Sequence, residues 1–482
     1  MLLCFIQIPF LMSFTSQPYA KIREKLVAGE LSVSTIVAQH LAQIQAYNHS
    51  LNAFLEVYEE EAVLKAIQVD EKIKAGTAGK LAGLVVGIKD LLCYEGHHSY
   101  AGSKILDSFK STFSATAVQR LLDEDAIIIG RQNCDEFGMG STNENSAYGP
   151  VLNFANQAYV AGGSSGGSAV AVQAGMCQVS LGTDTGGSIR MPAAFCGVVG
   201  LKPTYGLVSR WGLIAYASSF DTIGPISKYV SDARLVLDVI KGDDAQDSTV
   251  VKQAPATIPD KKRIAYIKEV VDHPSLQPEI KEAFHRKIAS LQALGYVVEG
   301  VDFPYIDQLL PTYYVLTTAE SSSNLSRFDG VKFGHRTENP GDLMQLYKRT
   351  RQEGFGEEVQ RRIMLGTFVL SADYYDAYYT KAQKVRRLIQ DKTLAILEDF
   401  DFIISPTTST TAYRVGEKTA DPIQMYLGDL FTVQANVAGI PGLSIPMGVD
   451  SEGLPMGFQL MSSPFQEQKL LDLGELVNAD EK

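Results

Sequence analysis

The sequence contains few cysteines, a single tryptophan and no long run of apolar residues. Its five cysteines are odd in number and widely spaced, and no two of them form a Cys-x-x-Cys pair. This usage argues against a disulfide framework and against a zinc site, and it is typical of a reducing compartment, so we expect a cytoplasmic protein. No stretch approaches the roughly 18 consecutive apolar residues of a membrane-spanning helix, and we expect no membrane attachment.

Positive charge is also scarce. The chain has 43 Lys and Arg against 55 Asp and Glu, which gives a formal net charge of −12. A protein that binds nucleic acid by itself needs a basic face to contact phosphates, so this balance disfavours a dedicated nucleic-acid binder. Any RNA that takes part in the function would be held mainly by a partner chain.

The 482 residues are enough to form a large core without disulfides. The chain begins with the apolar run MLLCFIQIPFLM, which is too short to span a bilayer and lacks the basic start of a secretion signal. We interpret residues 1–11 as an over-extended start, with Met12 as the natural first residue. We expect an N-terminal helical arm over 12–80 and one large domain over 81–482.

Apolar residues recur at helical spacing near the N-terminus and then in short runs separated by helices. This alternation predicts an α/β fold, in which a large mixed, mainly parallel central sheet is covered by helices on both faces. The expected strands are 84–88, 126–129, 179–181, 264–267, 296–301, 402–404, 443–447 and 456–461. The expected helices are 33–44, 56–75, 115–123, 169–174, 278–294 and 429–439, with a long helical region over about 310–398.

Two loops rich in glycine and serine carry the first chemical signal: GGSSGGSA at 162–169 and GTDTGGSIR at 182–190. One interpretation is a pair of tight structural turns. A second is a phosphate cradle, but the sequence lacks both GxxxxGK[ST] and a GxGxxG motif with its downstream acidic residue. The third is a serine-nucleophile site whose oxyanion is held by backbone amides. Those amides would be Thr185, Gly186, Gly187 and Ser188.

The first loop also matches GxSxG, the nucleophile elbow of α/β-hydrolases. That fold needs a downstream acid and a histidine, and the candidates His273, His285 and His335 lie in sequence typical of helices or polar loops. No histidine lies near either loop in the sequence, and no strong strand precedes the first one. These features disfavour the elbow.

Lys89 is a candidate base that needs no histidine. It ends the apolar run LVVGIKD, where one interpretation is a lysine whose amine reaches solvent at the end of a strand. The other is a partly desolvated lysine with a lowered pKa, whose neutral amine accepts a proton. With Ser164 and Ser188, such a lysine completes a proton relay.

Lys89, the GGSSGGS loop and the run DTGGSIRMPAAFCGVVGLKPTYG together resemble the amidase signature family, over about 84–225. The resemblance implies the family's Ser–cis-Ser–Lys triad, with Ser188 as the nucleophile, Ser164 as the bridging cis-serine and Lys89 as the base. One departure is Ala161, where many relatives carry proline before the double glycine. It lies outside the triad.

Three further segments, 321–336, 353–387 and 421–446, resemble one branch of this family, the glutamine-hydrolysing subunits of tRNA-dependent amidotransferases. An arginine suits the α-carboxylate of glutamine, and an aspartate suits its α-ammonium group. The alternative for Arg362 is a helix-surface charge beside Arg361. The glutamine-binding positions that the resemblance implies are Tyr313, Arg362 and Asp429, the backbone of Gly138 and Met139, and Thr185.

The resemblance to this branch implies a glutaminase that passes ammonia to a partner, which converts Glu-tRNA(Gln) to Gln-tRNA(Gln). The partners would be B and C subunits in a heterotrimer. This chain itself would need no cofactor and no metal, because ATP and Mg²⁺ would be used by the partner. One alternative is a free-standing amidase for aryl or aliphatic amides, with the same triad but no amino-acid clamp. Another is a mere scaffold for other chains, against which the intact triad argues.

Overall fold

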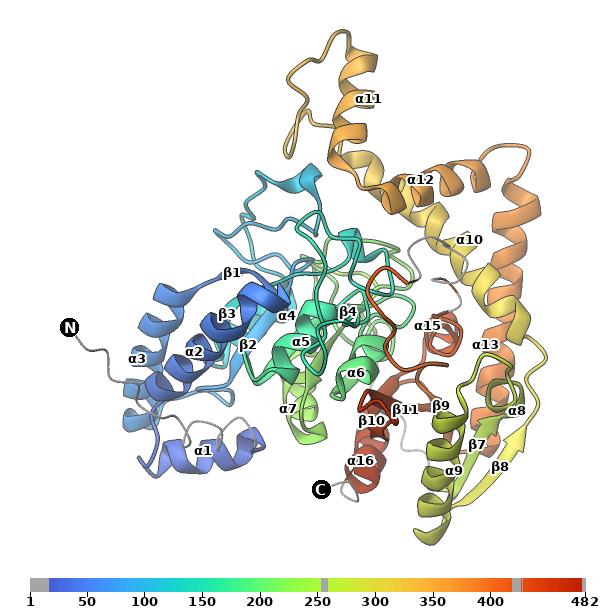
Figure 1. Cartoon of the computed structure of the whole chain (residues 1–482), viewed down its shortest axis with the longest axis horizontal. Coiled ribbons are helices and arrows are strands. Elements are labelled where there is room, and N and C mark those ends of the chain that lie inside the picture. Colours follow the sequence, from blue (N-terminus) through green and yellow to red (C-terminus); the bar gives the residue numbers. More distant parts are fainter. Residues whose placement is uncertain (1–16, 253–258, 418–425, 427, 479–482) are drawn as a thin grey trace.

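An 11-stranded sheet runs through the molecule and carries helices on both sides (Figure 1). The computed structural model describes residues 17–252, 259–417, 426 and 428–478. The strand order is β1-β3-β2-β4-β6-β5-β10-β11-β9-β7-β8. The strands are β1 Phe54–Val57, β2 Val85–Lys89, β3 Ile127–Gln132, β4 Val179–Asp184, β5 Val199–Lys202, β6 Thr222–Ser227, β7 Arg263–Ile267, β8 Val297–Val301, β9 Phe402–Pro406, β10 Gly442–Val449 and β11 Pro455–Ser462.

The predicted mixed sheet is confirmed, but its parallel part is smaller than expected. Strands β3, β2 and β4 are parallel neighbours, as are β9, β7 and β8. The pairs between these two groups, and the β1–β3 pair, are antiparallel, so antiparallel pairs predominate among the described strands. The sequence prediction omitted β1, β5 and β6, whose short runs include Gly, Pro or polar residues, and all three pair in antiparallel fashion.

Both faces of the sheet are buried along central strands such as β2, β3 and β4, which explains the nearly continuous apolar runs of these strands. Neighbouring residues alternate between two apolar cores: Val85 and Ile127 belong to one, Val86 and Ile128 to the other. The first core includes residues of α1, α2, α3 and α5, and the second includes residues of α4, α7, α9, α10, α13 and α16. These helices are α1 Tyr19–Val27, α2 Val33–Leu51, α3 Glu59–Ala75, α4 Thr116–Asp123, α5 Gly166–Gln173, α7 Val230–Ile240, α9 Pro278–Ala293, α10 Ile306–Asn324, α13 Lys381–Asp399 and α16 Glu467–Asn478.

The N-terminal segment is mostly helical but also contributes a strand. Helix α2 begins after Ser32, whose side chain accepts a hydrogen bond from the Thr35 amide and so caps the helix. The expected helix 56–75 begins at Glu59, because Phe54–Val57 pairs with β3 instead. The division at residue 80 remains a prediction, and the interpretation of residues 1–11 concerns residues outside the described part of the chain.

The expected long helical region 310–398 is divided into several elements at the upper right of Figure 1. After α10 come α11 Leu343–Gly354, α12 Glu357–Val369 and a π-helical turn, Asp376–Thr380, which leads into α13. The expected helix 429–439 is the shorter α15 Val433–Ala438. Within the described ranges, none of the helices has the length and apolar character needed to cross a bilayer.

Candidate active site

Lys89 is the last residue of β2, and its amine is completely buried. Strands β2 and β4 are parallel neighbours, so their carboxyl ends bring Lys89 to the same edge of the sheet as Thr183 and the loop that follows β4. The Lys89 Nζ donates to three hydroxyls: Ser164 Oγ at 2.7 Å, Ser165 Oγ at 2.9 Å and Thr183 Oγ1 at 2.8 Å. These contacts account for all three protons of an ammonium group. A solvent-exposed lysine at the strand end is therefore excluded.

Burial lowers the pKa of Lys89 to about 8, while nearby carboxylates, including Asp135 and Asp184, oppose this shift. A neutral amine is therefore accessible near neutral pH, and its lone pair accepts a proton from a neighbouring hydroxyl. Ser165 does not supply that proton, because its hydroxyl already donates to the Thr183 carbonyl at 3.1 Å. Ser164 has the hydroxyl nearest to Lys89, and this geometry favours Ser164 over Ser165 in the relay.

The loop that carries Ser188 lies directly against the first glycine-serine loop. Ser188 follows β4 and precedes α6 Arg190–Cys196, and its carbonyl accepts a hydrogen bond from the Ser165 amide at 3.2 Å. The Gly163–Ser164 peptide bond is cis. Both Ser164 and Ser188 are buried. The structure thus brings together the two loops that carry Ser164 and Ser188, at the buried end of Lys89.

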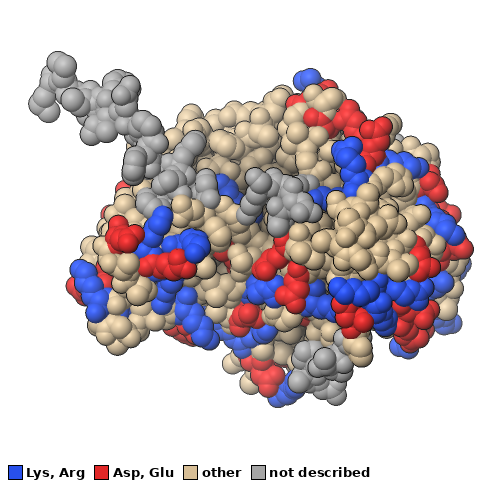
Figure 2. Space-filling model, turned by 90° about the horizontal axis from the view of Figure 1, so that it is seen from below, with Lys and Arg blue, Asp and Glu red and all other residues tan. Residues whose placement is uncertain are grey.

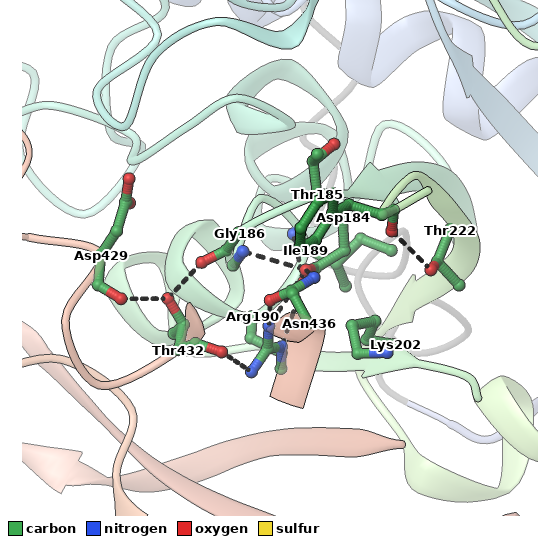
Figure 3. Close-up of polar contacts among 12 residues, drawn as sticks. Asp184, Thr185, Gly186, Ile189, Arg190, Lys202, Thr222, Asp429, Thr432 and Asn436 are labelled. Carbon is green, nitrogen blue, oxygen red and sulfur yellow. Dashed lines mark hydrogen bonds and ion pairs between the residues drawn. The ribbon is translucent and has the colours of Figure 1, made fainter. Parts of the chain in front are cut away.

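A buried ion pair holds the Ser188 loop in place (Figure 3). The Asp184 carboxylate accepts hydrogen bonds from the amides of Gly187 at 2.9 Å and Ile189 at 3.1 Å, and from Arg190 Nε and Nη2 at 3.1 and 3.0 Å. Burial by itself would raise the pKa of Asp184, but the positive charge of Arg190 and its hydrogen bonds outweigh that effect and hold the pKa at about 2. The carboxylate therefore stays ionised, and it fixes the backbone on both sides of Ser188.

The four predicted oxyanion amides are not equivalent. The Gly187 amide donates to Asp184, so this N–H is directed away from an oxyanion, which corrects the expectation for that residue. In the described part of the chain, the amides of Thr185, Gly186 and Ser188 donate no hydrogen bond. A Cβ added at Gly186 would lie 2.5 Å from the Tyr313 hydroxyl, so glycine is required there for the close approach of this tyrosine.

Arg362 lies in the interior, and the alternative of a helix-surface charge is wrong. The whole residue is 2% exposed, whereas the neighbouring Arg361 side chain is 34% exposed. Arg362 Nε donates to Glu358 Oε1 at 2.8 Å, and its Nη1 donates to the Tyr216 hydroxyl at 2.8 Å. Its guanidinium carbon also lies 5.3–5.6 Å from the ring centroids of three tyrosines, which provide an aromatic cage. The tyrosines are Tyr216, Tyr314 and Tyr426.

Asp429 is joined to the same group through Tyr314. Its Oδ1 accepts from Ser141 Oγ at 2.8 Å, and its Oδ2 accepts from the Tyr314 hydroxyl at 2.7 Å. Burial raises the pKa of Asp429 to about 6, against these two hydrogen bonds. Thr432 Oγ1 lies 3.0 Å from the Asp429 carbonyl oxygen and 2.6 Å from the Gly186 carbonyl oxygen (Figure 3). Thr432 therefore connects Asp429 to the loop after β4 that carries the predicted oxyanion amides.

The remaining predicted positions lie around the same centre. Gly138 and Met139 are buried, and a Cβ built at Gly138 would be 3.5 Å from Ser164 Oγ. Thr185 Oγ1 donates to Asp221 Oδ1 at 2.7 Å, which fixes the threonine side chain. The histidines of the elbow alternative lie elsewhere: His273 bonds to Ser275 and His335 to Glu353. The structure therefore supports a histidine-free serine centre.

Several residues of this arrangement were not predicted from the sequence. Ser165, Thr183, Asp184 and Arg190 all lie within or beside the two glycine-serine loops, so the loops themselves were the available signal. Glu358 precedes Arg362 by four residues, a spacing that places both side chains on one face of a helix.

The family model described as Amidase matches residues 35–471, nearly the whole chain. The chain belongs to the amidase family. The resemblance noted over residues 84–225 is thus confirmed and extends almost from end to end.

Within the amidase family, the similar curated proteins include the A subunits of glutamyl-tRNA(Gln) amidotransferases. That of Thermosynechococcus vestitus is 48% identical over 458 residues, which cover 93% of this chain and 95% of the relative. That of Methylococcus capsulatus is 46% identical over 469 residues, with 94% and 96% covered.

Solved structures of the amidase family show the same fold. The crystal structure of the glutamyl-tRNA(Gln) amidotransferase A subunit from Thermotoga maritima has a TM-score of 0.78 and 39% identity, and the match covers 95% of this chain and 94% of that one. A peptide amidase from Stenotrophomonas maltophilia has a TM-score of 0.83 and 28% identity, with 97% of both chains covered. The fold is therefore common to these A subunits and to other amidases, and it does not by itself identify the substrate.

Proposed function

We propose that this chain is the glutamine-hydrolysing A subunit of a glutamyl-tRNA(Gln) amidotransferase. The observation that carries the proposal is the pairing of Arg362 and Asp429 beside the serine–lysine centre. A buried cation and a buried carboxylate, linked through Tyr314, match the α-carboxylate and the α-ammonium of one free amino acid. The identity of 45–48% to named A subunits, over nearly the whole chain, supports the same assignment.

In the proposed reaction, Ser188 Oγ attacks the side-chain amide carbon of glutamine. Its proton passes to Ser164, whose own proton passes to the neutral Lys89 amine. The amides of Thr185, Gly186 and Ser188 stabilise the negative charge on the amide oxygen. The relay then returns a proton to the departing nitrogen, which leaves as ammonia, and water releases glutamate from the acyl-enzyme.

The alternative of a free-standing amidase uses the same serine–lysine centre. It gives no role to a fully buried arginine held by Glu358 and Tyr216, because simple aryl or aliphatic amides carry no carboxylate for it to bind. The peptide amidase and the aryl acylamidase among the structural relatives are 28% and 24% identical, well below the named A subunits. We therefore favour the glutaminase.

A protein partner is consistent with an exposed apolar segment at residues 364–378, which we call the aromatic patch. Its exposed side chains include Met364, Phe368, Tyr374 and Tyr378, and Asp373 and Asp376 are its only charges. Phe368 lies 4.3 Å from Tyr374 and 5.7 Å from Tyr378, measured between ring centroids. Enrichment in aromatic residues and Met, with few charges, is typical of the core of a protein interface. We propose that one of the partner chains docks here.

An RNA ligand fits the aromatic patch less well. The rings pack against each other, which restricts base stacking, and two carboxylates stand beside the tyrosines. On the face shown in Figure 2, Lys and Arg are interspersed with Asp and Glu. We propose that this chain belongs to a cytoplasmic heterotrimer in which the B and C subunits mainly hold Glu-tRNA(Gln). ATP and Mg²⁺ are used by the partner subunit. The present chain then supplies ammonia and requires no cofactor of its own.

The test of this function is glutamate release from glutamine, measured for the chain alone and with its B and C subunits, ATP and Glu-tRNA(Gln). We expect weak activity alone and clear stimulation by the complete system. A double substitution of Met364→Ser and Phe368→Ser should remove the stimulation and keep the basal activity. Leu64→Ser, an equally exposed apolar position on α3, serves as the control. Equal activity with and without the partners would contradict the proposal.

A further inference from the structure

The Glu358 carboxylate lies between the buried Arg362 and the surface. It belongs to the first turn of α12, and only 6% of the residue is exposed. Its Oε1 accepts hydrogen bonds from Arg362 Nε at 2.8 Å and from the Tyr426 hydroxyl at 3.0 Å. Its other oxygen pairs with Arg361 Nη1. Glu358 therefore holds one arginine inside the site and one at the surface.

The contact with Nε limits how Arg362 can bind another carboxylate. A guanidinium group has five N–H donors in one plane, and a carboxylate binds two of them in parallel. Such a fork uses either Nε with one terminal nitrogen or the two terminal nitrogens together. Because Glu358 occupies Nε, the edge formed by Nη1 and Nη2 is the one left for a second carboxylate. Nη1 carries two N–H groups, and its bond to the Tyr216 hydroxyl uses one of them.

Glu358 also compensates the charge of Arg362 and fixes its orientation before glutamine binds. Arg362 remains charged in the interior, and an unpaired buried charge is strongly unfavourable. Glu358 compensates this charge from the side opposite the terminal edge. The arginine is thus held in one orientation inside its tyrosine cage, and glutamine does not have to order it on binding.

We infer that Glu358 is a positioning residue that directs the terminal edge of Arg362 toward the α-carboxylate of glutamine. This inference rests on the proposed glutaminase function. It makes Glu358 a determinant of substrate selection: it acts on the amino-acid end of the substrate and leaves the chemistry at Ser188 unchanged. A general contribution of Glu358 to the stability of α12 would instead affect all substrates alike.

The neighbouring Glu357 provides a matched control. It belongs to the same first turn and also pairs with Arg361, at 3.0 Å, but its side chain is 91% exposed. Glu357→Gln and Glu358→Gln make the same chemical change one residue apart. The glutamine side chain has almost the same shape as glutamate, so both variants are expected to fold, and thermal melting will verify this.

The experiment measures kcat and KM for glutamine and for a simple aliphatic amide without an amino-acid group. For Glu358→Gln we expect the KM for glutamine to rise about tenfold or more, with kcat within about twofold and the simple amide unaffected. Glu357→Gln should behave like the wild type. An equal loss for both substrates, or an unchanged KM for glutamine, would overturn the inference.

A second measurement tests whether Glu358 acts through Arg362. In an Arg362→Ala background, Glu358→Gln should cause no further rise in the KM for glutamine, because the group that it positions is absent. An additional rise of the same size as in the wild type would overturn the inference. Failure of the proposed function is distinguishable, because the wild-type enzyme would then show no preference for glutamine over the simple amide.

Discussion

Lys89 Nζ lies 2.7 Å from Ser164 Oγ in a fully buried contact between the end of β2 and the loop before α5. Ser165 Oγ is almost as near, at 2.9 Å, but its proton is already used in a bond to the Thr183 carbonyl. The lysine thus has two serine neighbours, and one of them is free to act as a proton carrier. This difference favours Ser164 as the proton carrier, because a relay requires a hydroxyl that both gives and receives a proton.

Replacing the lysine by arginine tests whether a neutral base is required. Arginine keeps the positive charge but does not deprotonate in a protein, so Lys89→Arg should be almost as inactive as Lys89→Ala. The expected loss in kcat is at least about 10²-fold, the lower range for a general base. Steady-state assays of glutamate release provide the measurement. Substantial activity in the arginine variant would contradict the relay.

The pH dependence of kcat follows from the same residue. The amine is charged below its pKa and neutral above it, and burial lowers this pKa to about 8. The rate should therefore rise as the pH increases through about 8 and then level off. A pH–rate profile of kcat with glutamine checks this expectation. A rate that is constant or that falls over this interval would be incompatible with a neutral lysine.

The amino-acid clamp predicts a selective effect on KM. Arg362→Ala and Asp429→Ala should each weaken glutamine binding by about 1.5–3 kcal/mol, the usual range for hydrogen bonds to charged groups. Simple amides should be affected much less, because they have no groups for the clamp to bind. Arg387→Ala is the control, since this exposed arginine on α13 pairs with Asp391 at the surface. Normal glutamine binding by both clamp variants would favour the free-standing amidase.

Acid conditions should weaken the clamp independently of the lysine. Burial raises the pKa of Asp429 to about 6, so this carboxylate becomes neutral as the pH falls below that value. A neutral Asp429 no longer balances the α-ammonium group, and the KM for glutamine should rise. The measurement is KM against pH for glutamine and for a simple amide. A parallel rise for both substrates would assign the effect to another group.

The ion pair beneath the Ser188 loop predicts a loss of stability as well as of activity. Asp184→Asn leaves the fully buried Arg190 without its carboxylate, which should cost about 3–5 kcal/mol in the free energy of unfolding. Denaturant unfolding provides the measurement. Asp238→Asn breaks a half-exposed pair with Lys241 and should cost less than about 1 kcal/mol. Similar values for the two variants would show that Asp184 does not hold the loop.

The sequence was sufficient to predict the type of fold, and it supplied a specific hypothesis for the reactive residues, which the labelling experiment below tests. Lys89, Ser164 and Ser188 are widely separated in the chain, but each lies in a motif whose chemistry limits the alternatives. The long apolar strands were also predictable, because strands buried on both faces leave uninterrupted apolar runs. Short strands such as β5 and β6 were missed, since their pairing depends on distant partners and not on a local pattern.

The acceptor that each hydrogen-bond donor binds depends on the folded structure and could not be predicted from the sequence. The sequence placed Gly187 among the oxyanion amides, but its N–H is used by Asp184. It also could not decide whether Arg362 was buried, because Arg361 and Arg362 differ only in the direction of their side chains on α12. The acceptor of the Gly187 N–H and the burial of Arg362 are determined only when the helices and strands pack together.

The most direct test of the account is to identify the residue that forms the acyl-enzyme. The enzyme is treated with a glutamine analogue that carries an electrophilic carbonyl in place of the amide, and the modified peptide is identified by mass spectrometry. We expect the adduct on Ser188, none in Ser188→Ala, and slower labelling of the same serine in Ser164→Ala. An adduct on Ser164 or Ser165 would contradict the assignment of the nucleophile and, with it, the proposed mechanism.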